Sequence, residues 1–277
     1  MRFHISSRPH AKGFTLIEAV MVITITGILG AIVAVFIRKP VEGYFDSARR
    51  ASLTDTADTA VRRMGRDIGK ALPNSIREPD TNSQCVEFIP TRTGGRYRTE
   101  TDIMGAGDIL DFSAADSSFD MFGLNSALPA DQQIQDGDMI AVYNLGIPGS
   151  DAYNADNTSA VAASGVTAGV LANESNIAIA SKLFPLASGG NRFHVIPGNE
   201  KIVSFVCSGG KLYRNSNYAY ATSCPTTGAV LADHVSACTF SYDAVDMRNG
   251  LVRIALVLSS GGETVNLYHE VHVNNTP

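Results

Sequence analysis

One carboxylate stands at the start of a membrane-length apolar run. The heptapeptide KGFTLIE at positions 12–18 directly precedes an almost unbroken apolar stretch over 19–37. As a helix, such a stretch is long enough to cross a bilayer core of about 30 Å. An ionisable group there is costly and usually marks function. Glu18 is therefore the first candidate functional residue of the chain.

The residues around Glu18 resemble the processing site of type IV prepilins and type II secretion pseudopilins. That resemblance implies that a prepilin peptidase cuts after Gly13 and that Phe14 becomes the N-methylated first residue. It also implies that Glu18 pairs with the terminal amine of a neighbouring subunit during filament assembly. Helix physics agrees, because a carboxylate in the first turn interacts favourably with free N–H groups and the helix dipole. A partner ammonium would offset the remaining cost of burying the charge.

Three other kinds of N-terminus compete with this interpretation. A secretory signal peptide would have a basic start, which Arg2, Arg8 and Lys12 supply, but the apolar run is too long for one. A lipoprotein would need an early cysteine, and none precedes Cys85. A plain signal-anchor helix, in which Glu18 has no special role, stays open as an alternative.

Four cysteines in a domain expected outside the cytoplasm predict two disulfides, because that compartment is oxidising. Four cysteines allow three pairings. Cys207 and Cys224 enclose a loop of 16 residues, which favours local pairing and leaves Cys85 with Cys238. Free buried thiols are the alternative, and a metal site lacks any C-x-x-C spacing.

The sequence gives little support for catalysis or metal binding. There is no G-x-S-x-G, H-E-x-x-H or P-loop motif, so we predict no catalytic residue, no cofactor and no enzyme. His269 and His272 would point to opposite faces of a strand and could not share a metal. The aspartates at 136, 138, 151 and 156 could bind calcium, but turn chemistry explains them equally well, so no metal is predicted.

Charge argues against a nucleic-acid partner. The net charge is −5 and the isoelectric point is near 5.7, whereas a nucleic-acid surface needs a clustered basic excess. The arginines at 49, 50, 62, 63 and 66 alternate with aspartates on a predicted helix and are typical of a solvated face.

Helical periodicity continues beyond the apolar run. Apolar residues recur at helical spacing from Val41 to Leu72, which predicts an amphipathic helix over 38–72. Pro40 should bend or interrupt it, and Pro73 should end it. We expect this outer half to lie against a globular head.

The head, 73–277, shows short alternating runs separated by turn residues, and the predicted fold is α+β: a long N-terminal helix packed on an antiparallel β-sheet. Gly209 and Gly210 indicate a tight hairpin. The segment 146–190, rich in Ala, Ser, Asn and Gly, is predicted to be an exposed irregular insertion. The predicted strands are 85–89, 109–113, 139–144, 201–207, 211–214, 235–243, 251–258 and 264–273.

Two further segments narrow the resemblance. Residues 56–77 and the sequence TGGRYR at 93–98 resemble the large minor pilins of MSHA-type pili. The resemblance implies a leader over 1–13, a membrane and assembly helix over 14–37, and single-pass inner-membrane storage with the head facing the periplasm. Expected partners are the prepilin peptidase, other major and minor pilins, the inner-membrane assembly platform and the membrane. After assembly the protein would lie in a surface pilus and support adhesion.

Two alternatives remain at this point. A minor pseudopilin of a type II secretion system uses the same assembly chemistry inside the envelope. A membrane-anchored envelope binding protein or enzyme belongs to a different class.

Overall fold

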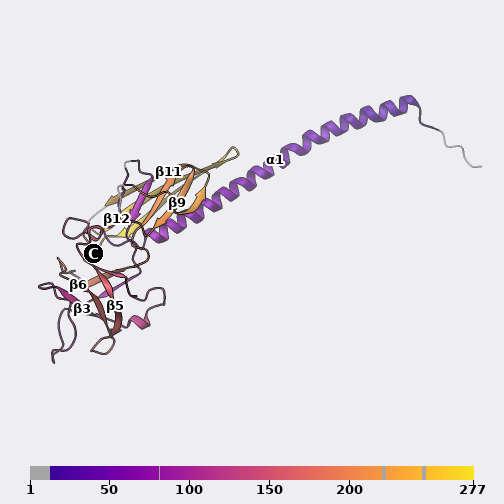
Figure 1. Ribbon diagram of the computed structural model, residues 1–277. Coiled ribbons are helices and arrows are strands. Elements are labelled where there is room, and N and C mark those ends of the chain that lie inside the picture. Colours follow the sequence, from indigo (N-terminus) through magenta and orange to yellow (C-terminus); the bar gives the residue numbers. More distant parts are fainter. Residues whose placement is uncertain (1–12, 81, 220–222, 245–247) are drawn as a thin grey trace, which may run out of the picture. The chain divides into compact units, whose positions relative to one another are not determined.

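The computed structural model describes residues 13–80, 82–219, 223–244 and 248–277 (Figure 1). The chain divides into two compact units, Met1–Ala51 and Ser52–Pro277. The division falls within one long helix, α1 (Leu16–Ile68). The first unit contains the apolar portion of α1, and the second contains the remainder of α1 and the β-rich head.

Pro40 was predicted to bend or interrupt the helix; α1 runs through Pro40 without an interruption, so that half of the prediction was wrong. Proline removes one N–H from the helical ladder, which deprives the carbonyl of Phe36 of its partner. The helix continues on both sides of this missing bond, and both positions are exposed. The helix ends at Ile68, four residues before Leu72, the predicted last residue.

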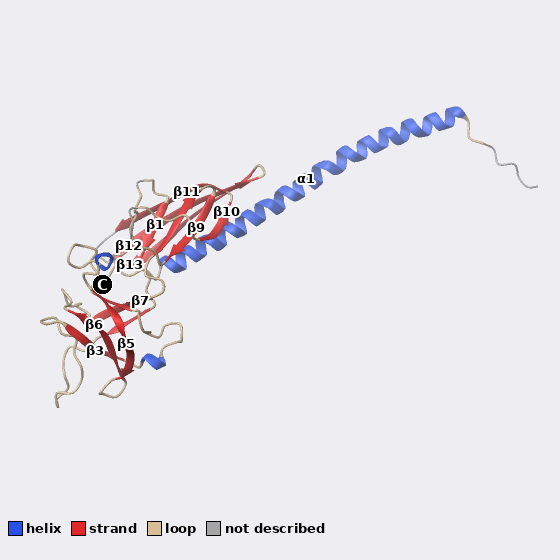
Figure 2. Ribbon diagram, viewed as in Figure 1, coloured by secondary structure: helices blue, strands red, loops and turns tan. Residues whose placement is uncertain are grey.

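The first lobe of the head packs two antiparallel sheets against residues 52–68 of α1 (Figure 2). Its apolar core takes Leu53, Ala57, Val61, Met64 and Ile68 from the helix, as the helical spacing predicted. The strands are β1 (Cys85–Phe88), β8 (Val203–Ser208), β9 (Lys211–Ser216) and β10 (Ala229–Asp233) in one sheet, and β11 (Val235–Ala244), β12 (Asn249–Ser260) and β13 (Glu263–Asn274) in the other.

Two local features explain how this lobe closes. Gly209 and Gly210 have positive φ and join β8 to β9 in a two-residue hairpin, which confirms the predicted turn. The N–H of Phe240 in β11 donates to the carbonyl of Ser83, just before β1, at 2.7 Å. That bond links the two sheets at their neighbouring edges, β11 and the start of β1.

The second lobe corrects the prediction of an irregular insertion. Residues 146–190 contain the 3-10 helix η2 (Ala152–Asn154) and two long strands, β5 (Thr158–Ala168) and β6 (Glu174–Lys182), which are inner strands of a six-stranded antiparallel sheet. The other strands are β2 (Thr93–Arg96), β3 (Asp116–Phe122), β4 (Met139–Val142) and β7 (Arg192–Ile196), in the order β2-β7-β4-β5-β6-β3. A second 3-10 helix, η1 (Asn125–Ala127), follows β3.

A strand was also predicted in the wrong place. Residues 109–113 form no strand, and β3 lies a few residues later. Leu110 instead makes a single backbone bond, its N–H donating to the carbonyl of Arg98 at 3.0 Å. The apolar residues of this segment therefore fill the second core without joining the sheet.

The disulfide pairing differs from the prediction: Cys85 pairs with Cys224, and Cys207 with Cys238. Strand alternation gives the reason. Cys85 lies opposite Val206 in the register of β1 and β8, so Cys85 and Cys207 point to opposite faces of the sheet. Cys207 and Cys238 both lie in the core beneath α1, while Cys85 meets the segment after β9 on the other face.

We expect non-reducing peptide mapping to recover the Cys85–Cys224 and Cys207–Cys238 peptides. The double variant Cys207→Ser with Cys238→Ser releases a cross-link between residues 31 apart, which by chain entropy alone corresponds to about 4 kcal/mol of unfolding free energy. Denaturant titration under oxidising conditions measures this loss. A Cys207–Cys224 peptide from folded protein would contradict the pairing.

Candidate assembly site at the helix N-terminus

The predicted processing residues lie outside regular structure, directly before α1. Gly13, Phe14 and Thr15 are exposed and precede the first helical residue, Leu16. The Phe14 ring is 84% exposed, and a Cβ at Gly13 would meet no atom within 4 Å. A peptidase could therefore reach the bond between Gly13 and Phe14 without unfolding any element.

Glu18 lies in the first turn of α1, as predicted, and shares a capping box with Thr15. The N–H of Glu18 donates to Thr15 Oγ1 at 3.4 Å, and Thr15 N donates to Glu18 Oε2 at 3.5 Å. The threonine and the glutamate three residues later thus satisfy each other's free N–H groups. We did not predict this role for Thr15, although the T-x-x-E spacing is a sequence signature of it.

The helix beyond Glu18 is long and apolar enough to cross a membrane by length and composition. None of the residues in its most apolar window is buried by the rest of the chain. The hydroxyls of Thr24 and Thr26 donate to the carbonyls of Val20 and Val22 at 3.0 and 2.6 Å. The polar side chains of the run are thus satisfied within the helix, as a lipid environment requires.

The carboxylate of Glu18 has no basic side chain within ion-pair distance among the residues that the structure describes. Its capping contacts to Thr15 are long, which makes them weak competitors for an incoming cation. A neighbouring chain's ammonium would find this carboxylate at the positive end of the helix dipole, accessible and uncompensated. The arrangement is suited to intermolecular charge pairing.

The other residues considered as metal ligands do not come together into a site in the described part of the chain. His269 is half-buried against α1 while His272 is exposed, on opposite faces of β13 as expected. Within the described ranges there is no cluster of three or more His, Cys, Asp or Glu side chains that could hold a metal. The carboxylate of Asp138 accepts from the N–H of Gln135 in its own turn at 3.0 Å. It also accepts from the N–H of Gly198 at 2.9 Å and pairs with Arg92 at 3.3 Å, so structural contacts occupy it.

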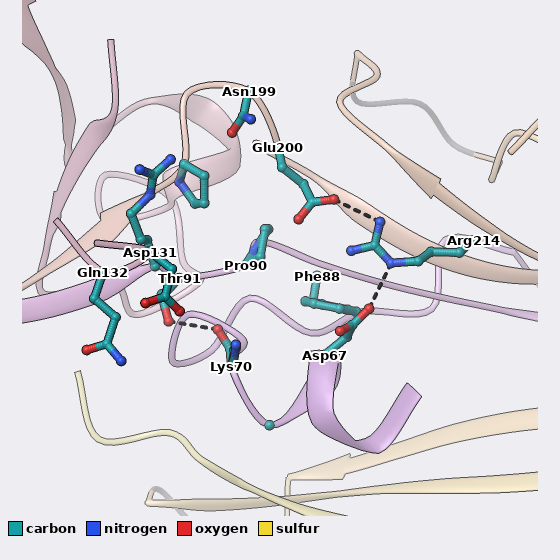
Figure 3. Close-up of a pocket in the computed structure, with 13 residues that line it drawn as sticks. Asp67, Lys70, Phe88, Pro90, Thr91, Asp131, Gln132, Asn199, Glu200 and Arg214 are labelled. Atoms are coloured by element: carbon teal, nitrogen blue, oxygen red, sulfur yellow. Dashed lines mark hydrogen bonds and ion pairs between the residues drawn. The ribbon is translucent and has the colours of Figure 1, made fainter. Parts of the chain in front are cut away.

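A pocket of about 720 Å³ lies in the head where the end of α1 meets the second lobe (Figure 3). Arg214 of β9 projects into it and bonds Asp67 of α1 at 2.7 Å and Glu200 at 2.8 Å. Thr91 donates its hydroxyl to the carbonyl of Lys70 at 2.8 Å. Because Arg214 is satisfied by two carboxylates, its role is to brace these segments.

The fold and the N-terminal motif together define a chain with one helix that is long and apolar enough to cross a membrane, followed by a β-rich head. Residues 8–34 match the family described as the prokaryotic N-terminal methylation motif. The N-terminus of the chain therefore carries a prepilin-type motif, the processing motif of the type IV pilin and pseudopilin superfamily. No curated protein and no solved structure matches the chain.

The motif implies processing by the prepilin peptidase and assembly with other pilins. Together with the apolar helix, it fits anchoring in the inner membrane before assembly. The match ends at residue 34 and therefore does not include the head.

Proposed function

We propose that this protein is a minor pilin that is processed at Gly13 and assembled at low copy into, or at the tip of, an MSHA-like type IV pilus. The observation that carries the proposal is the carboxylate of Glu18, which pairs with no basic side chain in the described part of the chain and stands at the start of an exposed, membrane-length helix. Filament subunits of this chemistry add by placing a terminal amine beside such a carboxylate. Support for pilus biogenesis and adhesion would follow.

The sequence and the size of the head support a minor rather than a major pilin. Segments 56–77 and 93–98 resemble the large minor pilins, closest to the MSHA pilus biogenesis protein MshO. In the structure the first segment forms the buried end of α1 and the chain leading to β1, and the second forms edge strand β2. A head with two lobes and a six-stranded second sheet is bulky, which suits a subunit needed once rather than repeated along a filament.

A minor pseudopilin of type II secretion is the alternative within the same superfamily, and the N-terminal chemistry fits it equally. Gene neighbourhood distinguishes the two. A membrane-anchored envelope binding protein or enzyme is the alternative from another class, and it makes no use of Gly13 or Glu18.

The mature protein should begin at Phe14 and carry an N-terminal methyl group. The bond after Gly13 is exposed and outside regular structure, so the peptidase can reach it. Intact-mass and N-terminal peptide mass spectrometry of protein from a host with the prepilin peptidase measures both changes. A retained leader in that host would reject the assignment to processed pilins and favour the anchored-domain alternative.

A further inference from the structure

The outer strand of the helix-packed lobe, β13, has an open edge. Among the described residues it pairs only with β12, and the register runs without a shift from Ser260 opposite Glu263 to Asn249 opposite Asn274. An edge of this kind presents a row of backbone donors and acceptors.

The register identifies which backbone groups face outward. The two-residue turn at Gly261 and Gly262 makes Ser260 and Glu263 a hydrogen-bonded pair, and bonded and non-bonded pairs then alternate along the ladder. The bond from Asn275 N to the carbonyl of Arg248, at 2.7 Å, fits the same phase. Six residues of β13 therefore direct N–H and C=O to the free edge, where no described backbone group meets them: Thr264, Asn266, Tyr268, Glu270, His272 and Asn274.

The other sheet edges of the head are protected. Strand β1 has four residues, and in β11 the N–H of Phe240 already bonds the carbonyl of Ser83. Strand β2 has four residues, and β10 has five with a register shift. Strand β3 has a register shift, and the N–H of Arg98 already bonds the carbonyl of Asp120 at 2.9 Å. Short length, bulges and covering segments are the usual defences of an edge.

None of these defences occurs in β13. It has 12 residues with the sequence ETVNLYHEVHVN, which contains no proline and no lysine. Glu270 is the one acidic residue among its outward positions, and its carboxylate is paired with Arg253 of β12 at 3.6 Å. A long and regular edge of this kind is a template for pairing with another chain.

A groove of about 520 Å³ runs between this strand and α1, lined by Thr59, Arg62, Gly65, Arg66, His269 and Val271. Gly65 opens it, since a Cβ there would lie 3.2 Å from His269 Nε2. Arg62 is paired with Asp58 at 2.6 Å, but Arg66 forms no ion pair with any residue that the structure describes. The groove is therefore positively charged and has no carboxylate among its lining residues.

We propose that β13 is a docking edge that accepts an extended segment of another protein subunit as an added strand, with an acidic side chain of that segment directed at Arg66. Main-chain bonds to the outward groups would supply affinity, and alternate side chains entering the groove would supply specificity. The proposal goes beyond the filament role, because the edge belongs to the head and does not involve Glu18.

Charge argues for a different chain rather than a second copy. In an antiparallel β13–β13 pair that uses all six outward residues, Thr264 lies opposite the copy's Asn274, and His269 lies opposite the copy's His269. The helix-facing set of the copy is Glu263, Val265, Leu267, His269, Val271 and Val273. Its one acidic member, Glu263, then lies beyond the far end of the strand, away from the groove beside His269 and Val271, so it leaves Arg66 unpaired. An acidic strand satisfies both the backbone edge and the arginine.

The probe is a synthetic extended peptide that alternates threonine and valine and carries two glutamates on one face. Its matched control has lysines in place of the glutamates. With the full chain in detergent micelles, fluorescence anisotropy should show at least tenfold tighter binding of the acidic peptide. Hydrogen exchange should slow at the outward amides of Thr264, Asn266, Tyr268 and Glu270, and not at amides already bonded to β12.

Two variants make the test specific. Tyr268→Pro removes one outward N–H at an exposed edge position, where proline is tolerated, and should abolish binding. Tyr268→Thr removes the same ring, keeps the N–H and should bind as the parent does. Arg66→Glu should reverse the preference towards the lysine peptide.

Three outcomes would overturn the proposal. The first is equal binding of both peptides, and the second is binding unaffected by Tyr268→Pro. The third is a dimer of the full chain that Tyr268→Pro dissolves, since this would assign the edge to a second copy.

Discussion

Replacing Glu18 by leucine should give a protein that is inserted and cleaved but at least tenfold depleted from sheared filaments. Insertion survives because leucine lengthens the apolar run, and cleavage survives because the Gly13–Phe14 bond lies outside the helix. The lost interaction is a charge pair in a low-dielectric helix bundle. At 4 Å and an effective dielectric constant of 20 such a pair is worth about 4 kcal/mol, which is ample for a tenfold effect.

The capping box requires a matched control, because Glu18→Leu also removes the cap. Thr15→Ala disrupts the box from its other side: it removes the hydroxyl that accepts from the N–H of Glu18, and it keeps the carboxylate. Its cost is about 1 kcal/mol of helix stability, so its incorporation should stay near the parent level. Quantitative immunoblotting of sheared filaments and membranes compares the variants. Parent-level incorporation of Glu18→Leu would leave Glu18 without an assembly role.

The N-terminal site was predictable because its information is local. A charge at the mouth of an apolar run, a Gly13 before it and a T-x-x-E spacing are all readable from adjacent residues. The same holds for the buried face of α1, where Leu53, Ala57, Val61, Met64 and Ile68 follow helical periodicity. The Gly209–Gly210 hairpin is equally local.

The second lobe was not predictable in the same way. Strand β5 has the sequence TSAVAASGVTA, in which alanine and serine hide the alternation that marks a strand. It is extended because it is sandwiched between β4 and β6, whose residues supply Ile140, Ile177 and Ile179 to the core. Strand propensity depends on such neighbours more than on the residues themselves.

The prediction of the disulfide pairing was wrong for a related reason. Loop length favoured a bond between Cys207 and Cys224. In a sheet, however, the face to which each cysteine side chain points decides which cysteines can pair. That face is known only once the strand register is known. Cys85 lies opposite Val206, so the next residue, Cys207, points to the other face of the sheet. That face is the core, where the Cys238 side chain of β11 also lies. Pairings between strands distant in sequence carry no local signal.

A buried ion pair lies on strand β1, and the loss of one of its partners should be strongly destabilising. Glu87 of β1 is fully buried and accepts from Arg77 Nε at 2.6 Å and from the hydroxyl of Tyr218. The guanidinium of Arg77 lies 3.2 Å from the ring centroid of Tyr153. Burial, together with the bond to Glu87, raises the pKa of the Tyr218 hydroxyl, which keeps it a donor at neutral pH. The core beneath α1 contains Val86 and Phe88, so Glu87 and its partners lie on the other face of β1. There they link β1 to the segment after β9.

Glu87→Ala should lower the free energy of unfolding by about 3–5 kcal/mol, because it leaves the Arg77 charge largely buried without its carboxylate. Asp58→Ala is the matched control: it breaks an arginine–carboxylate pair on the exposed face of α1, where the side chains are 73% and 46% exposed. Such surface pairs are worth about 0–1 kcal/mol. Denaturant titration of both variants at neutral pH compares the two sites. Equal, small losses would mean that water reaches the Glu87 cluster and that it does not brace the lobe.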